Sequence, residues 1–96
     1  MRFRLTFTEE AGRVLQELQE KKNPKLKKVL KTLGLMETNL RHPGLQTHEF
    51  TSLSGPKGEK VFESYVENRT PGAWRVFWFY GPKRSMIRVL NISQHP

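Results

Sequence analysis

The sequence lacks cysteine and aspartate, and it has no long apolar run. Without cysteine, the 96-residue chain can form neither a disulfide framework nor a thiolate metal site. All nine acidic residues are glutamate, so the paired aspartates that often hold Mg²⁺ in nucleases are absent. No apolar run approaches a membrane span, and the N-terminus lacks the pattern of a signal peptide. We therefore expect a single domain over residues 1–96 that is cytoplasmic, with no metal, no cofactor and no membrane contact.

Positive charge is in large excess. Seventeen Lys and Arg oppose nine Glu, which gives a net charge of +8 and a pI near 10.2. Such an excess on a small domain favours a polyanionic partner, nucleic acid first, or an acidic protein. Many of the cations lie in or beside the segment that follows residue 23, and we expect four of them to contact RNA phosphates: Lys25, Lys27, Lys28 and Lys31. The alternative is an ordinary solvated helix face.

The first half of the chain predicts one strand and two helices. Residues 2–7 alternate between apolar and polar side chains, as in a strand with one buried face. Thr8 is typical of a helix N-cap, and helical apolar spacing follows it. Asn23 and Pro24 restart a helix that the spacing extends to about residue 41. Because almost nothing joins the helices, we expect an antiparallel hairpin.

From residue 47 the apolar period changes from 3.6 to 2. This pattern predicts four strands separated by turns that contain Gly, Pro or Asn, at 47–53, 60–68, 74–80 and 86–92. A strand, two helices and then four strands predict an α+β fold, with one mainly antiparallel sheet and the helical hairpin on one face. The other face of the sheet would be open unless a partner covers it.

The strand at 74–80 carries the sharpest signal. Its run of Trp-Arg-Val-Phe-Trp-Phe-Tyr is too apolar for anything but a central strand, and Arg75 is its only charge. Alternation places Arg75 on the same face as Phe77 and Phe79. On a helix-free face, the guanidinium could hold a phosphate. The alternative is a cross-strand ion pair with Glu63 or Glu67, and periodicity alone does not choose between the two.

The three histidines are weaker candidates for site residues than Arg75. His95, near the C-terminus, could act as a general acid or base near neutral pH, or could be a tail residue without a role. His42 fits a turn. His48 precedes the second strand and could reach a groove on the sheet. Three scattered histidines without acidic partners at ligand spacing make a metal site unexpected.

Two further motifs resemble a known family. Ala-Trp-Arg-Val-Phe-Trp at 73–78 resembles the Gly-Tyr-Arg-Val-x-Tyr strand of the RelE/ParE toxins of bacterial type II toxin–antitoxin systems. Ile-Arg-Val-Leu-Asn-Ile-Ser-Gln-His at 87–95 is similar to that family's last strand, which ends in His or Tyr. The Asn, His, Pro and Gly residues at 39–44 and the order of elements also fit, so the resemblance covers nearly the whole chain.

The resemblance implies a function, a mechanism and a partner. Ribonuclease members of the family enter the ribosomal A site and cut mRNA without a metal, by attack of a 2′-hydroxyl on the adjacent phosphate. Arg75 matches the family's strand arginine, which implies that it stabilises the charge of the phosphate. His95 matches the terminal His or Tyr, which implies that it protonates the leaving 5′-oxygen. The resemblance also implies a cognate antitoxin that covers the cationic groove.

The chain departs from the ribonuclease pattern in two places. The strand before Arg75 reads Phe62-Glu63-Ser64-Tyr65, where many ribonuclease members carry Lys or Arg. Ser93-Gln94 likewise replaces basic residues before the terminal His. The general base is therefore open between Glu63, Tyr65 and His48. A second branch of the superfamily inhibits DNA gyrase, and that function, or simple antitoxin binding by an inactive relative, is the alternative to RNA cleavage.

Overall fold

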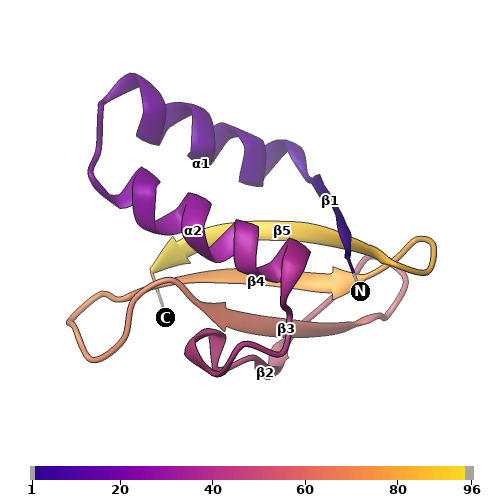
Figure 1. Cartoon of the computed structure of the whole chain (residues 1–96). Coiled ribbons are helices and arrows are strands. Elements are labelled where there is room, and N and C mark those ends of the chain that lie inside the picture. The colour runs from indigo at the N-terminus through magenta and orange to yellow at the C-terminus, as the bar shows by residue number, and fades with distance from the viewer. Residues whose placement is uncertain (1, 95–96) are drawn as a thin grey trace.

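The computed structural model describes residues 2–94, which form two helices, a short 3-10 turn and five strands (Figure 1). In chain order these are β1 (Arg4–Phe7), α1 (Glu9–Glu20), α2 (Lys25–Thr38), η1 (Pro43–Leu45), β2 (His48–Ser54), β3 (Lys60–Tyr65), β4 (Trp74–Tyr80) and β5 (Met86–Gln94). The sheet order is β1-β5-β4-β3-β2, with β1 parallel to β5 and the other pairs antiparallel. The predicted α+β fold and the central position of β4 are confirmed.

The two helices form the predicted antiparallel hairpin over one face of the sheet (Figure 1). The Thr8 hydroxyl accepts from the Ala11 N–H at 3.1 Å and donates to the Leu90 carbonyl at 2.7 Å, so the cap of α1 also ties it to β5. At the start of α2, the Asn23 side chain accepts from the Lys25 N–H at 2.9 Å. Thr8 is the N-cap of α1, as predicted, whereas Pro24, predicted as the first helical residue, occupies the N-cap position of α2, directly after Asn23.

The end of α2 was predicted about three residues too late. The helix ends at Thr38, and Asn39 leaves helical geometry with φ −154° and ψ 71°. Leu40 continues the apolar spacing, yet it packs against the core from the following loop. Periodicity reports only that a side chain is buried, and a loop residue can meet that condition as well as a helical one.

The main core lies between the helices and the sheet. Its strand residues are Val76 and Trp78 of β4 with Ile87, Val89 and Ile92 of β5, packed against apolar side chains of both helices. Trp78 is fully buried, its indole N–H donates to the Ser64 hydroxyl at 2.9 Å, and its ring stacks on Phe62. Since the even-numbered residues of β4 face the helices, Arg75 lies on the helix-free face.

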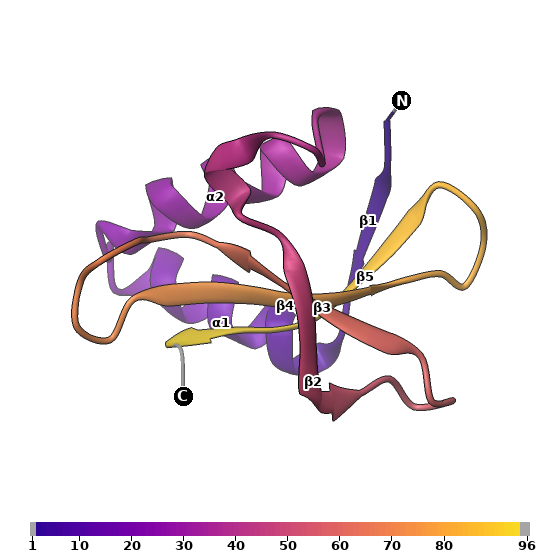
Figure 2. The same cartoon turned by 90° about the horizontal axis from the view of Figure 1, so that it is seen from below.

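The sequence predicted that the helix-free face would be open unless a partner covered it. In the structure, this face is covered over β4 by the chain itself. Phe77 and Phe79 on this face are only 3% and 5% exposed. Phe50 of β2 reaches the Phe77 ring with 5.0 Å between centroids, although β3 lies between the two strands in the sheet order. Figure 2 shows β2 crossing steeply beneath β3 and β4 on the side away from the helices. The register of β2 is irregular between Glu49 and Ser54, and such an irregularity increases the local twist.

The end of β3 also differs from the prediction, which extended the strand to residue 68. The strand ends at Tyr65, and the N–H groups of Val66 and Glu67 both donate to the Trp74 carbonyl. This doubled pairing breaks the alternation. Glu67, predicted to share a face with Glu63, instead turns its carboxylate toward α2. At the other end of the sheet, β5 runs to Gln94, two residues further than predicted.

Candidate functional site

Four predicted site residues come together on the helix-free face. Strand pairing places His48 opposite Glu63 and Tyr65 opposite Arg75. Arg75, Glu63 and Tyr65 point the same way from neighbouring strands, and the His48 ring meets the Tyr65 ring edge-on at 5.8 Å. We call these four residues the Arg75 cluster. Three neighbouring strands contribute to it, so it depends on the order of strands in the sheet.

The Arg75 side chain is 7% exposed and held on several sides. Its Nη1 donates to the carbonyls of Glu67 and Trp74, at 2.6 and 3.1 Å. The guanidinium carbon lies 3.6 Å from the centre of the Tyr65 ring, a cation–π contact. Nε lies 3.9 Å from a Glu63 carboxylate oxygen, yet within the described residues it makes no hydrogen bond. Arg75 therefore faces away from the helices and also pairs with Glu63, as the second interpretation predicted, whereas phosphate binding stays a prediction.

Glu63 and His48 form a second pair within the cluster. The Glu63 carboxylate is 1% exposed and accepts from His48 Nε2 at 2.8 Å. His48 Nδ1 lies 2.8 Å from the Gln46 carbonyl oxygen, so both ring nitrogens have an oxygen within hydrogen-bond distance. The His48 side chain is 48% exposed. A buried carboxylate is thus flanked by an arginine and by a histidine that solvent can reach, which is an arrangement able to move a proton.

The sequence carried no signal for the backbone groups that set this geometry. The Gln46 carbonyl orients His48, and Gln46 adopts a left-handed conformation with φ 45° at the end of η1. The carbonyls of Glu67 and Trp74 orient Arg75. Every residue has a carbonyl, so only the fold shows which ones contact a functional side chain.

The predicted RNA-binding lysines divide into two pairs. Lys25 and Lys28 both bind the Glu67 carboxylate, at 2.5 and 3.1 Å. Lys27 and Lys31 are exposed and form no ion pair within residues 2–94. The Lys25 hydrogen bond lowers the pKa of Glu67, helped by Lys28 and by the Trp74 N–H and opposed by burial. Part of the positive charge of α2 is thereby neutralised at the β3–β4 connection.

The Glu67 contacts predict a pH-dependent contribution to stability. Because the folded state lowers the pKa of Glu67 from its ordinary 4.5, the stabilisation is complete above that value and is lost as the pH falls through the folded pKa. We expect Glu67→Gln to reduce the free energy of unfolding by about 1 kcal/mol at pH 7, because the lysine partners are partly exposed. The gap between variant and parent should narrow on acidification below 4.5. Urea unfolding at pH values from 7 to below 4.5 measures the loss of stability and its dependence on pH. Glu37→Gln is the control, because Glu37 forms an exposed ion pair with Arg2. An equal gap at all pH values would contradict the assignment.

A shallow cleft borders the Arg75 cluster on the side of α2. It has a volume of about 360 Å³, and Lys28, Lys31, Tyr65 and Glu67 are among the residues that line it. Tyr65 is shared by this cleft and the Arg75 cluster, and its carbonyl accepts from the Thr32 hydroxyl of α2 at 3.2 Å.

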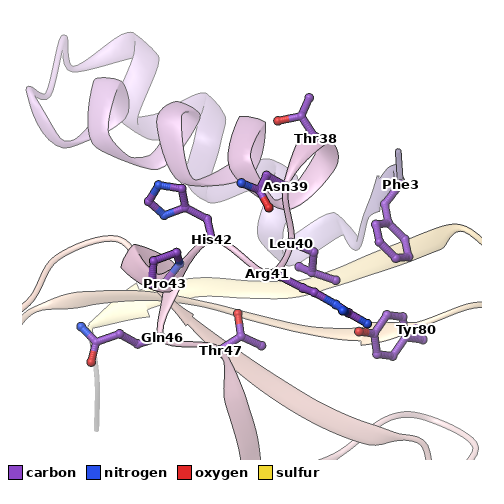
Figure 3. A pocket seen from close by; sticks show the side chains of 10 residues that line it. All are labelled: Phe3, Thr38, Asn39, Leu40, Arg41, His42, Pro43, Gln46, Thr47 and Tyr80. Atoms are coloured by element: carbon purple, nitrogen blue, oxygen red, sulfur yellow. The ribbon is translucent and has the colours of Figure 1, made fainter. Parts of the chain in front are cut away.

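A larger cleft, of about 780 Å³, lies elsewhere, between the end of α2, the loop that follows it and the end of β4 (Figure 3). Arg41 extends across it toward Tyr80, and Phe3 lies on the other side of Tyr80. None of the predicted site residues that the structure describes lines this cleft. Its size therefore does not mark the candidate active site, which is identified by the convergence of charged groups around Arg75.

His95, the predicted general acid, lies outside the described residues, which end at Gln94. Within the described part of the chain, no cluster of three or more His or Glu side chains has the geometry of a metal site. Neither described helix combines the length and the apolar character that a membrane crossing requires.

Comparison with known proteins identifies the fold. No family model matches the chain, and no curated sequence is detectably similar to it. Solved structures do match over nearly the full length. The archaeal RelE of a RelE–RelB complex from Pyrococcus horikoshii superposes with a TM-score of 0.66 at 15% identity, covering 98% of this chain and 96% of that one. A YoeB/ParE toxin from Agrobacterium tumefaciens gives 0.70 at 10% identity, covering 98% and 100%.

A third structure, of a YoeB–YefM complex from Staphylococcus aureus, gives a TM-score of 0.67 at 15% identity and covers both chains completely. With the sheet order and the helical hairpin described above, these matches define the fold class. The chain has the fold of the RelE/ParE toxins, which confirms the structural part of the resemblance seen in the sequence. At such identities the likeness extends to the fold alone, and activity has to be argued from the site.

Proposed function

We propose that this protein is the toxin of a type II toxin–antitoxin system and cleaves mRNA on the ribosome without a metal. The observation that carries the proposal is the Arg75 cluster. In a chain with the RelE/ParE toxin fold, an arginine, a carboxylate, a histidine and a tyrosine converge on the helix-free face of the sheet. Phosphodiester cleavage by a 2′-hydroxyl requires a cation at the phosphate and groups that accept and donate protons.

The proposed roles follow from position. The 2′-oxygen attacks the adjacent phosphorus, and its proton passes to the Glu63 carboxylate, the acceptor of the His48–Glu63 pair. Arg75 stabilises the negative charge that develops on the phosphate oxygens, and the Tyr65 ring holds the guanidinium in place. The bond to the 5′-oxygen breaks, and His95 protonates that oxygen. The products are a 2′,3′-cyclic phosphate and a 5′-hydroxyl, so no outside reactant is consumed.

The lysines of α2 would position the strand without reading its sequence. Lys27 and Lys31 are exposed and outside ion pairs within the described residues, so they can meet phosphates directly. Lys25 and Lys28 would have to share their charge with Glu67. We therefore assign the larger part of this contribution to Lys27 and Lys31.

One observation favours the second candidate, a non-catalytic toxin that inhibits DNA gyrase as the ParE branch does, or an inactive relative that only binds its antitoxin. Arg75 is 7% exposed, and two carbonyls and the Tyr65 ring already occupy its guanidinium. RNA cleavage would require a phosphate to displace part of this contact set. A purely structural Arg75 requires no such change.

The proposed partner is a cognate antitoxin, and the proposed place of action is the cytoplasm, where ribosomes lie. Similar structures were solved as complexes with RelB, YefM and DinJ. With a net charge of +8, this chain suits an acidic or amphipathic antitoxin segment that covers the groove as a helix or a strand. We expect an adjacent gene that encodes such a protein.

The decisive experiment expresses the wild-type chain without its antitoxin. We expect growth arrest, with translation-dependent mRNA cuts that leave 2′,3′-cyclic phosphate ends in primer extension and end analysis. Purified ribosomes programmed with mRNA should give the same cuts, with the same cyclic phosphate ends, when the purified protein is added. Growth arrest with uncut mRNA and trapped gyrase–DNA complexes would instead establish the second candidate.

A further inference from the structure

A second cleft lies on the helix-free face, toward the end of β4 opposite to Arg75. It has a volume of about 480 Å³, between the ends of β1, β4 and β5 and the loop that joins β2 to β3. Thr6, Phe79, Met86 and Arg88 form its sheet side, and Lys57 and Glu59 its loop side, among others. Among residues 2–94, none of the predicted site residues contributes to it.

Strand pairing fixes the position of Arg88 in this cleft. Arg88 lies opposite Thr6 in β1 and opposite Phe79 in β4, so the three side chains stand next to one another on one face. Arg88 is half-buried and forms no ion pair within residues 2–94, and the same holds for the exposed Lys57 ammonium. The acid in the lining is Glu59, which accepts from the Lys57 backbone N–H at 2.8 Å. Two cations thus oppose one carboxylate.

The Thr6 hydroxyl adds an independent observation. It is buried and has no hydrogen-bond partner. Within the described residues, the other buried side-chain atom without a partner is Nε of Arg75. Buried polar groups are normally paired, and an unpaired group often marks the place of a missing ligand or ion. Both unpaired donors lie on the helix-free face, at opposite ends of the same sheet.

We propose that this cleft, the Arg88 cleft, binds a backbone phosphate of RNA. The guanidinium fork of Arg88 and the Lys57 ammonium would hold the phosphate oxygens, and the Thr6 hydroxyl would donate to one of them after a small rotation. Phe79 and Met86 supply an apolar wall for the adjoining nucleoside. The inference rests on the proposed function, because the strand in question is the one whose cleaved phosphate lies at Arg75.

Arg75 and Phe79 are four residues apart on β4, which corresponds to about 13 Å of strand. Phe50 of β2 covers Phe77 between them, so an RNA strand that reached both sites would pass over the outside of β2. An acidic protein segment could also present a carboxylate to Arg88. We favour RNA because the cleft shares its face and its central strands with the Arg75 cluster, and a nucleic acid strand brings phosphates at regular intervals to both.

The first test measures binding of an uncleavable 2′-O-methyl RNA strand by fluorescence anisotropy over a series of salt concentrations. Removing one phosphate contact lowers the slope of log affinity against log salt by about 0.7 for a single strand. We expect this decrease for Arg88→Ala, the parental slope for Arg88→Lys, and no change for the control Lys21→Ala at the exposed end of α1. A parental slope for Arg88→Ala, together with Arg88-dependent binding of poly-L-glutamate, would overturn the proposal.

The second test measures binding to vacant ribosomes, because the bound phosphate could belong to mRNA or to ribosomal RNA. Weaker binding of Arg88→Ala to the free strand assigns the cleft to mRNA, and weaker binding to vacant ribosomes alone assigns it to ribosomal RNA. Undiminished binding in both arms rejects the inference. These binding measurements do not depend on cleavage. If the salt slope depended on Arg88 in a protein that cuts no RNA, the proposed function would be wrong, whereas RNA binding by the Arg88 cleft would still hold.

Thr6→Val separates a ligand-binding role from a structural one. The substitution removes an unpaired buried hydroxyl at nearly constant shape, so Tm should stay the same or rise. If the hydroxyl meets a phosphate, the same variant should bind the RNA strand more weakly. Equal affinity of Thr6→Val and the parent would remove Thr6 from the proposed site.

Discussion

Arg75→Ala is expected to lower the single-turnover rate of mRNA cleavage on ribosomes by about 10²- to 10³-fold, the usual effect of losing one group that stabilises transition-state charge. Growth arrest should be relieved in parallel. The effect should be large because, on the proposed mechanism, Arg75 is the cation nearest to the reacting phosphate. Nε of Arg75 is buried and has no hydrogen bond within the described residues, so a phosphate that displaced part of the surrounding contacts would give this donor an acceptor.

A control for folding is essential, because Arg75 is buried and satisfies two carbonyls. We expect Arg75→Ala to lose about 1–3 kcal/mol of stability, so rates should be compared well below its Tm. Arg75→Lys keeps the charge and can still donate to the Glu67 carbonyl, but it lacks the planar fork. A variant that loses stability and cleaves at the parental rate would show that Arg75 is only structural. Parental toxicity of both variants would contradict the proposed mechanism.

Glu63→Gln is expected to lower the cleavage rate by about 10²- to 10⁴-fold, the range associated with a general acid or base. Glutamine preserves the shape of the side chain and can still accept from His48, whose Nε2 lies 2.8 Å from the carboxylate. It removes the negative charge that allows the His48–Glu63 pair to take up a proton. The loss should appear in the chemical step and should leave the affinity for an uncleavable RNA strand nearly unchanged.

The pH dependence of cleavage distinguishes this role from a structural one. If the His48–Glu63 pair accepts the proton, Glu63→Gln should change the acidic limb of the rate profile as well as its height. Glu49→Gln is the matched control, since Glu49 is an exposed neighbour of His48 on β2. A Glu63→Gln protein with a reduced rate and a parental pH profile would leave Tyr65 or another group as the base.

Most of the secondary structure was predictable because it depends on local chemistry. Thr8 caps α1 through a bond to Ala11, the Asn23 side chain accepts from the first N–H of α2, and a period of 2 identified all four later strands. The errors lie where a buried side chain leaves regular structure. Leu40 packs from a loop, and the doubled pairing at Trp74 ends β3 three residues early.

The candidate site was predictable only in part. The sequence indicated Arg75 from its isolation in an apolar strand, and the resemblance indicated His95, which lies outside the described residues. Glu63, Tyr65 and His48 were open alternatives for one role. The structure places all three in one cluster with Arg75, because strand pairing sets Tyr65 opposite Arg75 and His48 opposite Glu63. Pairings between distant segments have no local signature.

By itself, the sequence determined the excess of positive charge, the order of the elements, and the alternation that puts Arg75 on one face with Phe77 and Phe79. The tertiary structure decided which face the helices cover, that β2 crosses the other face, and that Glu67 binds two of the lysines of α2. It also brought Thr6 beside Arg88, 82 positions later in the chain. The physical reason is that periodicity fixes orientation within a strand, whereas contacts between strands depend on their order, register and twist.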